Sequence, residues 1–159
     1  MRSRSCSAAL EADPFDPTAP GCYVRRRPNG FVAHFCASAD ALRALRRLTR
    51  TELHGHGFDT EAVDTVQLVV SELTGNAVRA CGDRVPLVVE VYVSSFGLAV
   101  NVHDPDPGVL PVRGTTPLDS AVAERGRGLG LLDVLAPGWH VRNSAIGKQV
   151  RCRVPVPAR

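Results

Sequence analysis

The longest regular pattern of apolar and polar positions predicts a helix from about Asp59 to Ala80. Asp59 is a suitable N-cap, and Glu61 places negative charge in the first turn, where the helix dipole favours it. Glu72 and Asn76 lie four residues apart at the edge of the apolar stripe, where a carboxylate and an amide can meet a ligand. Taken alone, the pair also fits a solvated helix flank without function. The stripe recurs at helical spacing through Val63, Val66, Val70, Leu73 and Ala77.

Shorter patterns predict three hairpins and a second helix before the central hairpin. A strand from Tyr23 and a second strand over 31–35 flank Pro28-Asn29-Gly30, a turn signal that favours a hairpin. Ser38 or Asp40 caps a helix with an apolar leucine face. Strict alternation over 85–93 and 98–103 predicts an antiparallel pair, and 139–143 with 148–154 predicts another.

Asp104 ends the second strand of the central hairpin. By alternation it falls on the inward-facing side with Val102. A carboxylate at the inner end of a core strand needs a partner. Two interpretations stay open at this point: an Asp-Pro turn of no functional importance, or an acceptor for an amine group of a ligand.

A long aperiodic stretch over 109–125 leads into a glycine-rich run, Gly126-Arg127-Gly128-Leu129-Gly130, and then a short apolar helix. A loop of that length inside a compact domain is usually functional or mobile. Glycine lets the backbone approach a phosphate, and a helix N-terminus supplies free N–H groups. The spacing is neither the dinucleotide fingerprint nor a Walker loop, so the run alone is a weak signal.

Composition narrows the class of protein. At 159 residues and 44% hydrophobic content, the chain is long enough for one domain with a sizeable core. We expect residues 1–20 to form a disordered leader and residues 21–159 to form a single domain.

No apolar run approaches the roughly 18 residues of a membrane span, and no signal-peptide core follows Arg4, so we expect a cytoplasmic protein without membrane contact. A net charge of +3 is too mild to indicate direct nucleic-acid binding, and five scattered cysteines indicate reduced thiols.

Taken in order, a Glu-x-x-x-Asn on a long helix, an Asp at a strand end and a glycine-rich run resemble the GHKL superfamily of ATP-binding domains, which includes histidine kinases, gyrase B and MutL. The closest likeness is to the stand-alone anti-sigma-factor serine/threonine kinases. The resemblance implies an α/β (α+β) two-layer sandwich, the Bergerat fold, with a mixed, mostly antiparallel sheet and helices on one face. The matching segments are Leu68–Leu73 with Asn76–Val78, Gly126–Leu132, Trp139, and Gly147-Lys148 with Val150.

The resemblance also implies roles for individual residues. Asn76 would hold Mg²⁺ against the phosphates of ATP, Glu72 would polarise the attacking hydroxyl or water, and Asp104 would accept a hydrogen bond from the adenine amino group. The remaining ATP-binding positions are Gly108, Gly126, Arg127, Gly128 and Gly130, with Arg127 a charge partner for the γ-phosphate. Gly75 inside the helix, and Asp104-Pro105-Asp106-Pro107-Gly108 in place of the usual Asp-x-Gly-x-Gly, depart from the family pattern.

The implied function is a protein serine/threonine kinase that uses Mg-ATP to phosphorylate a small antagonist of an anti-sigma factor. The alternative is a nucleotide-sensing module that sequesters a sigma factor or another regulator without catalysis. A homodimer is compatible with either hypothesis.

Overall fold

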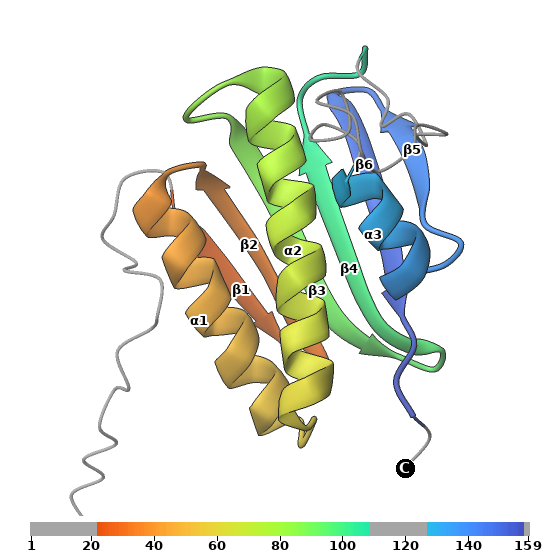
Figure 1. Cartoon of the computed structure of the whole chain (residues 1–159). Helices are drawn as coiled ribbons and strands as arrows, with labels where there is room; N and C mark the ends of the chain where they lie inside the picture. The colour runs from red at the N-terminus through yellow and green to blue at the C-terminus, as the bar shows by residue number, and fades with distance from the viewer. Residues whose placement is uncertain (1–21, 109–126, 158–159) are drawn as a thin grey trace, which may run out of the picture.

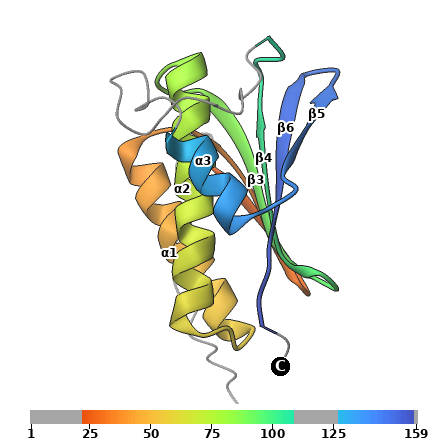
Figure 2. The same cartoon turned by 45° about the vertical axis from the view of Figure 1, so that its right-hand side comes forward.

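The computed structural model describes residues 22–108 and 127–157 of the chain. Within these residues, three helices cover one face of a six-stranded sheet, so the domain has two layers (Figures 1 and 2). The predicted leader, residues 1–20, and the aperiodic stretch 109–125 lie outside the described residues. No helix in the described part is both long and apolar enough to cross a membrane.

The sheet is built from three hairpins in the order β1-β2-β3-β4-β6-β5. All five pairings are antiparallel, which confirms the expectation of a mostly antiparallel sheet; the described strands contain no parallel pair. The expected two-layer α/β architecture is therefore confirmed. The strands are β1 (Tyr23–Arg27), β2 (Gly30–Cys36), β3 (Pro86–Ser94), β4 (Gly97–Asp104), β5 (His140–Ser144) and β6 (Gly147–Val154).

Two long helices begin at side-chain caps that the sequence predicts. Helix α1 spans Ala39–Gly55, and of the two candidate caps it is Ser38 that accepts a hydrogen bond from the backbone N–H of Ala41, at 3.1 Å. Helix α2 spans Thr60–Cys81, with the Asp59 carboxylate accepting from the Ala62 N–H at 2.9 Å. Each cap satisfies a backbone donor that has no partner inside the helix.

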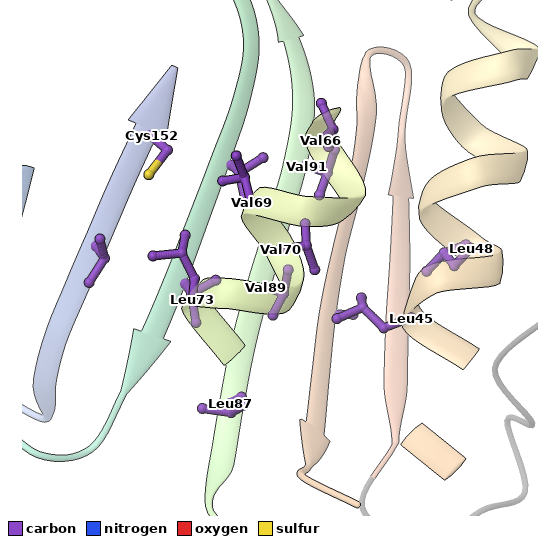
Figure 3. Packing of buried hydrophobic residues seen from close by; sticks show 14 of the residues in the cluster. Leu45, Leu48, Val66, Val69, Val70, Leu73, Leu87, Val89, Val91 and Cys152 are labelled. Carbon is purple, nitrogen blue, oxygen red and sulfur yellow. The ribbon is translucent and has the colours of Figure 1, made fainter. Parts of the chain in front are cut away.

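The core lies between α2 and the middle of the sheet (Figure 3). Strand alternation turns the apolar side chains of β3 and β4 toward the helices, and α2 lays its valine and leucine stripe on them. Helix α1 adds Leu45 and Leu48 from the side, and β6 adds Cys152. The α2 residues in contact with this layer include Val66, Val69, Val70 and Leu73.

The short helix α3 (Arg127–Leu135) lies beside α2 on the same face of the sheet (Figure 2). It begins earlier than the glycine-rich sequence suggests, because Gly128 and Gly130 both fall inside its first turn. Leu132 and Ala136 are buried and attach the helix to the core. The helix ends before the buried Trp139, whose indole N–H donates to the Asp133 carboxylate at 2.8 Å.

Candidate functional site

Helix α2 presents Glu72 and Asn76 half-buried along one edge, as the sequence predicts. The Asn76 side-chain oxygen accepts a hydrogen bond from the guanidinium of Arg79, one turn further on. No described residue forms a hydrogen bond or an ion pair with the Glu72 carboxylate. The helix edge therefore offers a free carboxylate, an amide oxygen and a cation within two turns.

Asp104 points into the protein at the end of β4 and is only 3% exposed. Its Oδ1 atom accepts a hydrogen bond from Lys148 Nζ at 2.9 Å and from the backbone N–H of Asp106 at 2.9 Å. Lys148 is also 3% exposed, and its Nζ donates a second hydrogen bond to the Asp106 carbonyl at 2.7 Å. The carboxylate that the sequence places on the core face is thus half of a buried ion pair.

Gly147 allows this ion pair to form. It precedes Lys148 in β6 and has a φ of 143°, a conformation that favours glycine. A Cβ atom there would lie 2.0 Å from the Asp104 carbonyl oxygen and 2.7 Å from Pro105 Cα. Because that space is taken by backbone, any side chain at 147 would push the start of β6 away from the end of β4 and separate Lys148 from Asp104.

The last residue of α2, Cys81, joins the helix to the buried pair. Its Sγ donates toward Asp104 Oδ1 over 3.8 Å, a weak hydrogen bond. Burial, and then the negative charge of Asp104, raise the pKa of the Cys81 thiol. The thiol therefore stays protonated at neutral pH and remains a donor to the carboxylate.

The contact between Cys81 and Asp104 fixes how far Asp104 lies from Asn76 and Glu72 along α2. Asp104 lies beside Cys81 at the end of α2, while Asn76 is five residues back along the helix, about 7–8 Å at 1.5 Å per residue, and Glu72 is about 13 Å back. In Figure 1 the N-terminal end of α3 faces the end of the sheet that carries Asp104. The site therefore has one end with a buried carboxylate and another with an amide, a cation and a carboxylate.

The N-terminus of α3 is the second source of donors. The first four N–H groups of a helix lack partners inside it, and in α3 these belong to residues 127–130. A Cβ atom on Gly130 would meet no described atom within 4 Å. Packing among the described residues thus gives no reason for glycine there, whereas close approach of a phosphate would. Gly126 lies outside the described residues.

Gly108 is the last described residue before the stretch 109–126. It is exposed, and its N–H donates to the Asp106 carboxylate at 2.8 Å. Asp106 in turn is tied to Asp104 and Lys148, so a chain of hydrogen bonds holds residues 104–108 in one conformation. The structure gives this segment an ordered turn but does not bring Gly108 against Asn76 or Glu72.

The match to a family model decides what kind of domain carries this site. The model of the histidine kinase-like ATPase domain matches residues 35–154. The chain belongs to the histidine kinase-like ATPase family. The ATPase domain is also similar to an uncharacterised protein of Streptomyces coelicolor, with 41% identity over 73 residues, which are 45% of this chain and 67% of that protein. Domains of this family bind ATP, so ATP is the ligand against which the site is tested.

The residues of the ATPase domain fit ATP. Asp104 Oδ2 accepts no hydrogen bond from any described residue, although the side chain is buried, so the carboxylate keeps an acceptor for the amino group of a base. Arg79 and the N–H groups of the first turn of α3, which have no partner inside the helix, suit a polyphosphate, because cations and helix N-termini both bind phosphate. Donors and acceptors are thus distributed as a nucleotide requires.

Three residues of the site were missed by the interpretation of the sequence. Lys148 stands out as the single lysine of the chain, and strand alternation places it inward with Val150, which was the available signal. Arg79 was detectable from its spacing of three from Asn76 on the same helix. Cys81 offered no signal, because its contact depends on where α2 ends relative to β4.

A separate hollow of about 670 Å³ lies at the opposite end of β4, around the β3–β4 turn. None of the predicted site residues lines it. The residues that line the hollow include Pro28, Phe58, Phe96 and Val156.

Proposed function

We propose that this domain binds Mg-ATP along the α2 edge and transfers the γ-phosphate to a serine or threonine of a partner protein. The base lies at the Asp104 end, and the phosphates lie between Asn76, Arg79 and the N-terminus of α3. The observation that carries the proposal is the half-buried Glu72 carboxylate, which has no partner among the described residues and sits one turn from Asn76.

Phosphoryl transfer requires positioning and charge neutralisation more than covalent chemistry from the protein. Glu72 takes the proton from the acceptor hydroxyl while the hydroxyl oxygen bonds to the γ-phosphorus and the bond to the leaving ADP oxygen breaks. The Asn76 amide oxygen is a hard ligand that would hold Mg²⁺, and the ion would supply charge neutralisation at the phosphates. Arg79 adds a permanent positive charge beside Asn76.

The partner that we propose is a small antagonist of an anti-sigma factor, in the cytoplasm. The likeness of the α2 and α3 segments to the stand-alone anti-sigma-factor kinases supports this choice. The second candidate function is a sensing module that sequesters a sigma factor without phosphoryl transfer. The segment after Asp104 favours the second candidate, because Asp106 stands where the family motif Asp-x-Gly-x-Gly carries its first glycine, and Pro105 and Pro107 fix the backbone on either side of it.

Two substitutions on one helix edge test the roles. Asn76→Ala should weaken Mg-ATP binding at least tenfold and metal-free ADP much less, because it removes a metal ligand. Glu72→Gln should bind ATP as tightly as the wild type, while transfer falls by about 10²–10⁴-fold, the usual effect of losing a general base. Calorimetry measures binding, and single-turnover transfer from labelled ATP to a captured partner measures chemistry.

Glu61→Gln, an exposed carboxylate in the first turn of the same helix, is the matched control and should change neither quantity. If Glu72→Gln abolishes nucleotide binding, the general-base role is wrong. If the wild type binds Mg-ATP but transfers no phosphate to any captured partner, the sensing module replaces the kinase as the function.

A further inference from the structure

The ion pair of Asp104 and Lys148 has hydrogen-bonding capacity that the described protein leaves unused. All three contacts to the carboxylate, from Lys148, Asp106 and Cys81, converge on Oδ1, and no described residue donates to Oδ2. An ammonium group has three N–H donors. Those of Lys148 reach two acceptors among the described residues, Asp104 Oδ1 and the Asp106 carbonyl. One donor and one acceptor therefore remain.

Such a pair is unusual inside a protein, because buried polar groups are nearly always fully hydrogen-bonded. Among the described residues, the buried hydroxyl groups of Thr49 and Thr74 satisfy this rule by donating to carbonyls of their own helices at 2.8 Å. A free donor next to a free acceptor, held by β4 and β6, is a complement for a ligand edge that carries one acceptor beside one donor.

We propose that Lys148 is a specificity-determining residue that reads N1 of the adenine ring, while Asp104 Oδ2 accepts from the neighbouring 6-amino group. The inference rests on the proposed function, which places the base at the Asp104 end. Adenine presents an amino donor at C6 and an acceptor at N1, side by side, as the two open positions require. Lys148 thereby acts on the ligand directly and also holds the carboxylate toward it.

Guanine fits this pair poorly. In the same orientation it presents a carbonyl to Asp104 and an N–H to Lys148, so acceptor meets acceptor and donor meets donor. A site that leaves buried polar groups unpaired rejects the wrong ligand strongly. The lysine thus adds a second point of discrimination to the one that a carboxylate alone would give.

Atom deletions in the ligand test the proposal on the unaltered protein. Calorimetry compares ADP with 1-deaza-ADP, which replaces the N1 acceptor by C–H, and with 7-deaza-ADP, which alters a ring atom that Lys148 does not read. We expect 1-deaza-ADP to bind about tenfold to hundredfold more weakly than ADP, the range for a hydrogen bond with a charged donor. We expect 7-deaza-ADP to bind within about twofold of ADP.

A variant then identifies the donor. In Lys148→Met the ratio of the two dissociation constants, 1-deaza-ADP over ADP, should fall to about one, because no donor to N1 remains. Lys148→Arg keeps a donor and a charge and should preserve part of the ratio. Thermal melts establish that each variant is folded. If Lys148→Met does not fold, the arginine variant and the ligand series on the wild type carry the test.

Two results would overturn the proposal: equal binding of ADP and 1-deaza-ADP to the wild type, or an undiminished 1-deaza penalty in Lys148→Met. Both leave the proposed ATP site intact, because ADP still binds. If neither ADP nor ATP binds the wild type, the proposed function itself fails and the role of Lys148 fails with it.

Discussion

Two regions on the helix-covered face of the sheet differ in how completely their buried polar groups are hydrogen-bonded. In the middle, between the helices and the sheet, the core is apolar (Figure 3). The buried hydroxyls of Thr49 on α1 and Thr74 on α2 donate to carbonyls of their own helices. At the end of β4, two opposite charges are buried together, and each keeps a hydrogen-bonding position that no residue in 22–108 or 127–157 fills. The middle is complete without a ligand, whereas the charged end is not.

The difference separates the residues that stabilise the fold from those that prepare a site. Apolar burial stabilises a domain at roughly 25 cal/mol per Å², with no need for exact partners. Burying an ion pair costs hydration free energy that the attraction between the two charges only partly offsets, so such a pair stabilises a fold poorly. This weak effect on stability supports the proposal that Asp104 and Lys148 are groups aimed at a ligand.

The largest effect should come from breaking that pair on one side. Lys148→Met leaves an uncompensated carboxylate in the protein and should lower the free energy of unfolding by about 3–5 kcal/mol. Replacing both residues, Asp104→Leu with Lys148→Met, should restore wild-type stability or exceed it while abolishing nucleotide binding. Urea unfolding, together with calorimetry of ADP binding, measures both properties on the three proteins.

The control belongs to the middle of the core. Leu45→Ala on α1 removes buried apolar volume away from the charged end and should cost about 2–5 kcal/mol. The folded fraction of this variant should bind ADP with wild-type affinity. A double variant of the ion pair that is as unstable as Lys148→Met would show that the charges stabilise the fold, and would remove the contrast between the two regions.

Sequence periodicity was sufficient to predict the elements in the middle of the domain and one residue of the buried ion pair. The stripe on α2 and the alternation on β3 and β4 follow from local geometry, so both the elements and the inward direction of Asp104 were predictable. Lys148 was not identified as its partner, because the two residues are 44 positions apart and meet only through the β4–β6 register. Register between distant strands is not written in either strand alone.

The start of α3 shows a second limit of the same kind. Glycine is a poor helix former, so local propensity favours a loop through Gly128 and Gly130. The helix nevertheless includes both, and its buried Leu132, with Ala136 directly after its end, contributes to the core. Tertiary packing outweighs propensity over this short stretch.

An effect of intermediate size should appear if the middle of the core is forced to carry charge. Burial raises the pKa of the Cys152 thiol on β6 from its ordinary value of 9.0 to about 12. The unfolded chain loses its thiol proton first as pH rises, so the stability contributed by the neutral thiol is complete below pH 9.0 and declines toward about pH 12. At about pH 11 the loss is on the order of 2–3 kcal/mol, at 1.36 kcal/mol per pKa unit.

Urea unfolding at about pH 8 and about pH 11 measures this loss. Cys152→Ala should be less stable than the wild type at the lower pH, because it leaves a small cavity, yet should lose less stability on the way to the higher pH. Cys36→Ala removes an exposed thiol at the end of β2 and should keep the wild-type slope. Identical alkaline slopes for the wild type and Cys152→Ala would contradict the assignment.

The smallest effect should come from Gly75, on the α2 edge next to Asn76. Alanine is favoured over glycine inside a helix by about 1 kcal/mol, so Gly75→Ala should raise the melting temperature by a few degrees. Its Cβ would lie 3.2 Å from Arg79 Nη1, and the flexible guanidinium can shift away at little cost. That shift moves the cation off the Asn76 oxygen, so affinity should fall for ATP but hardly for adenosine, which has no phosphate for Arg79 to neutralise. Melting curves measure the change in stability, and calorimetry with ATP and adenosine measures the change in affinity. The control is Ala80→Gly, at an exposed position on the same helix, which should lower stability and leave both affinities unchanged. Equal loss of ATP and adenosine binding in Gly75→Ala would mean that Arg79 does not serve the phosphate end.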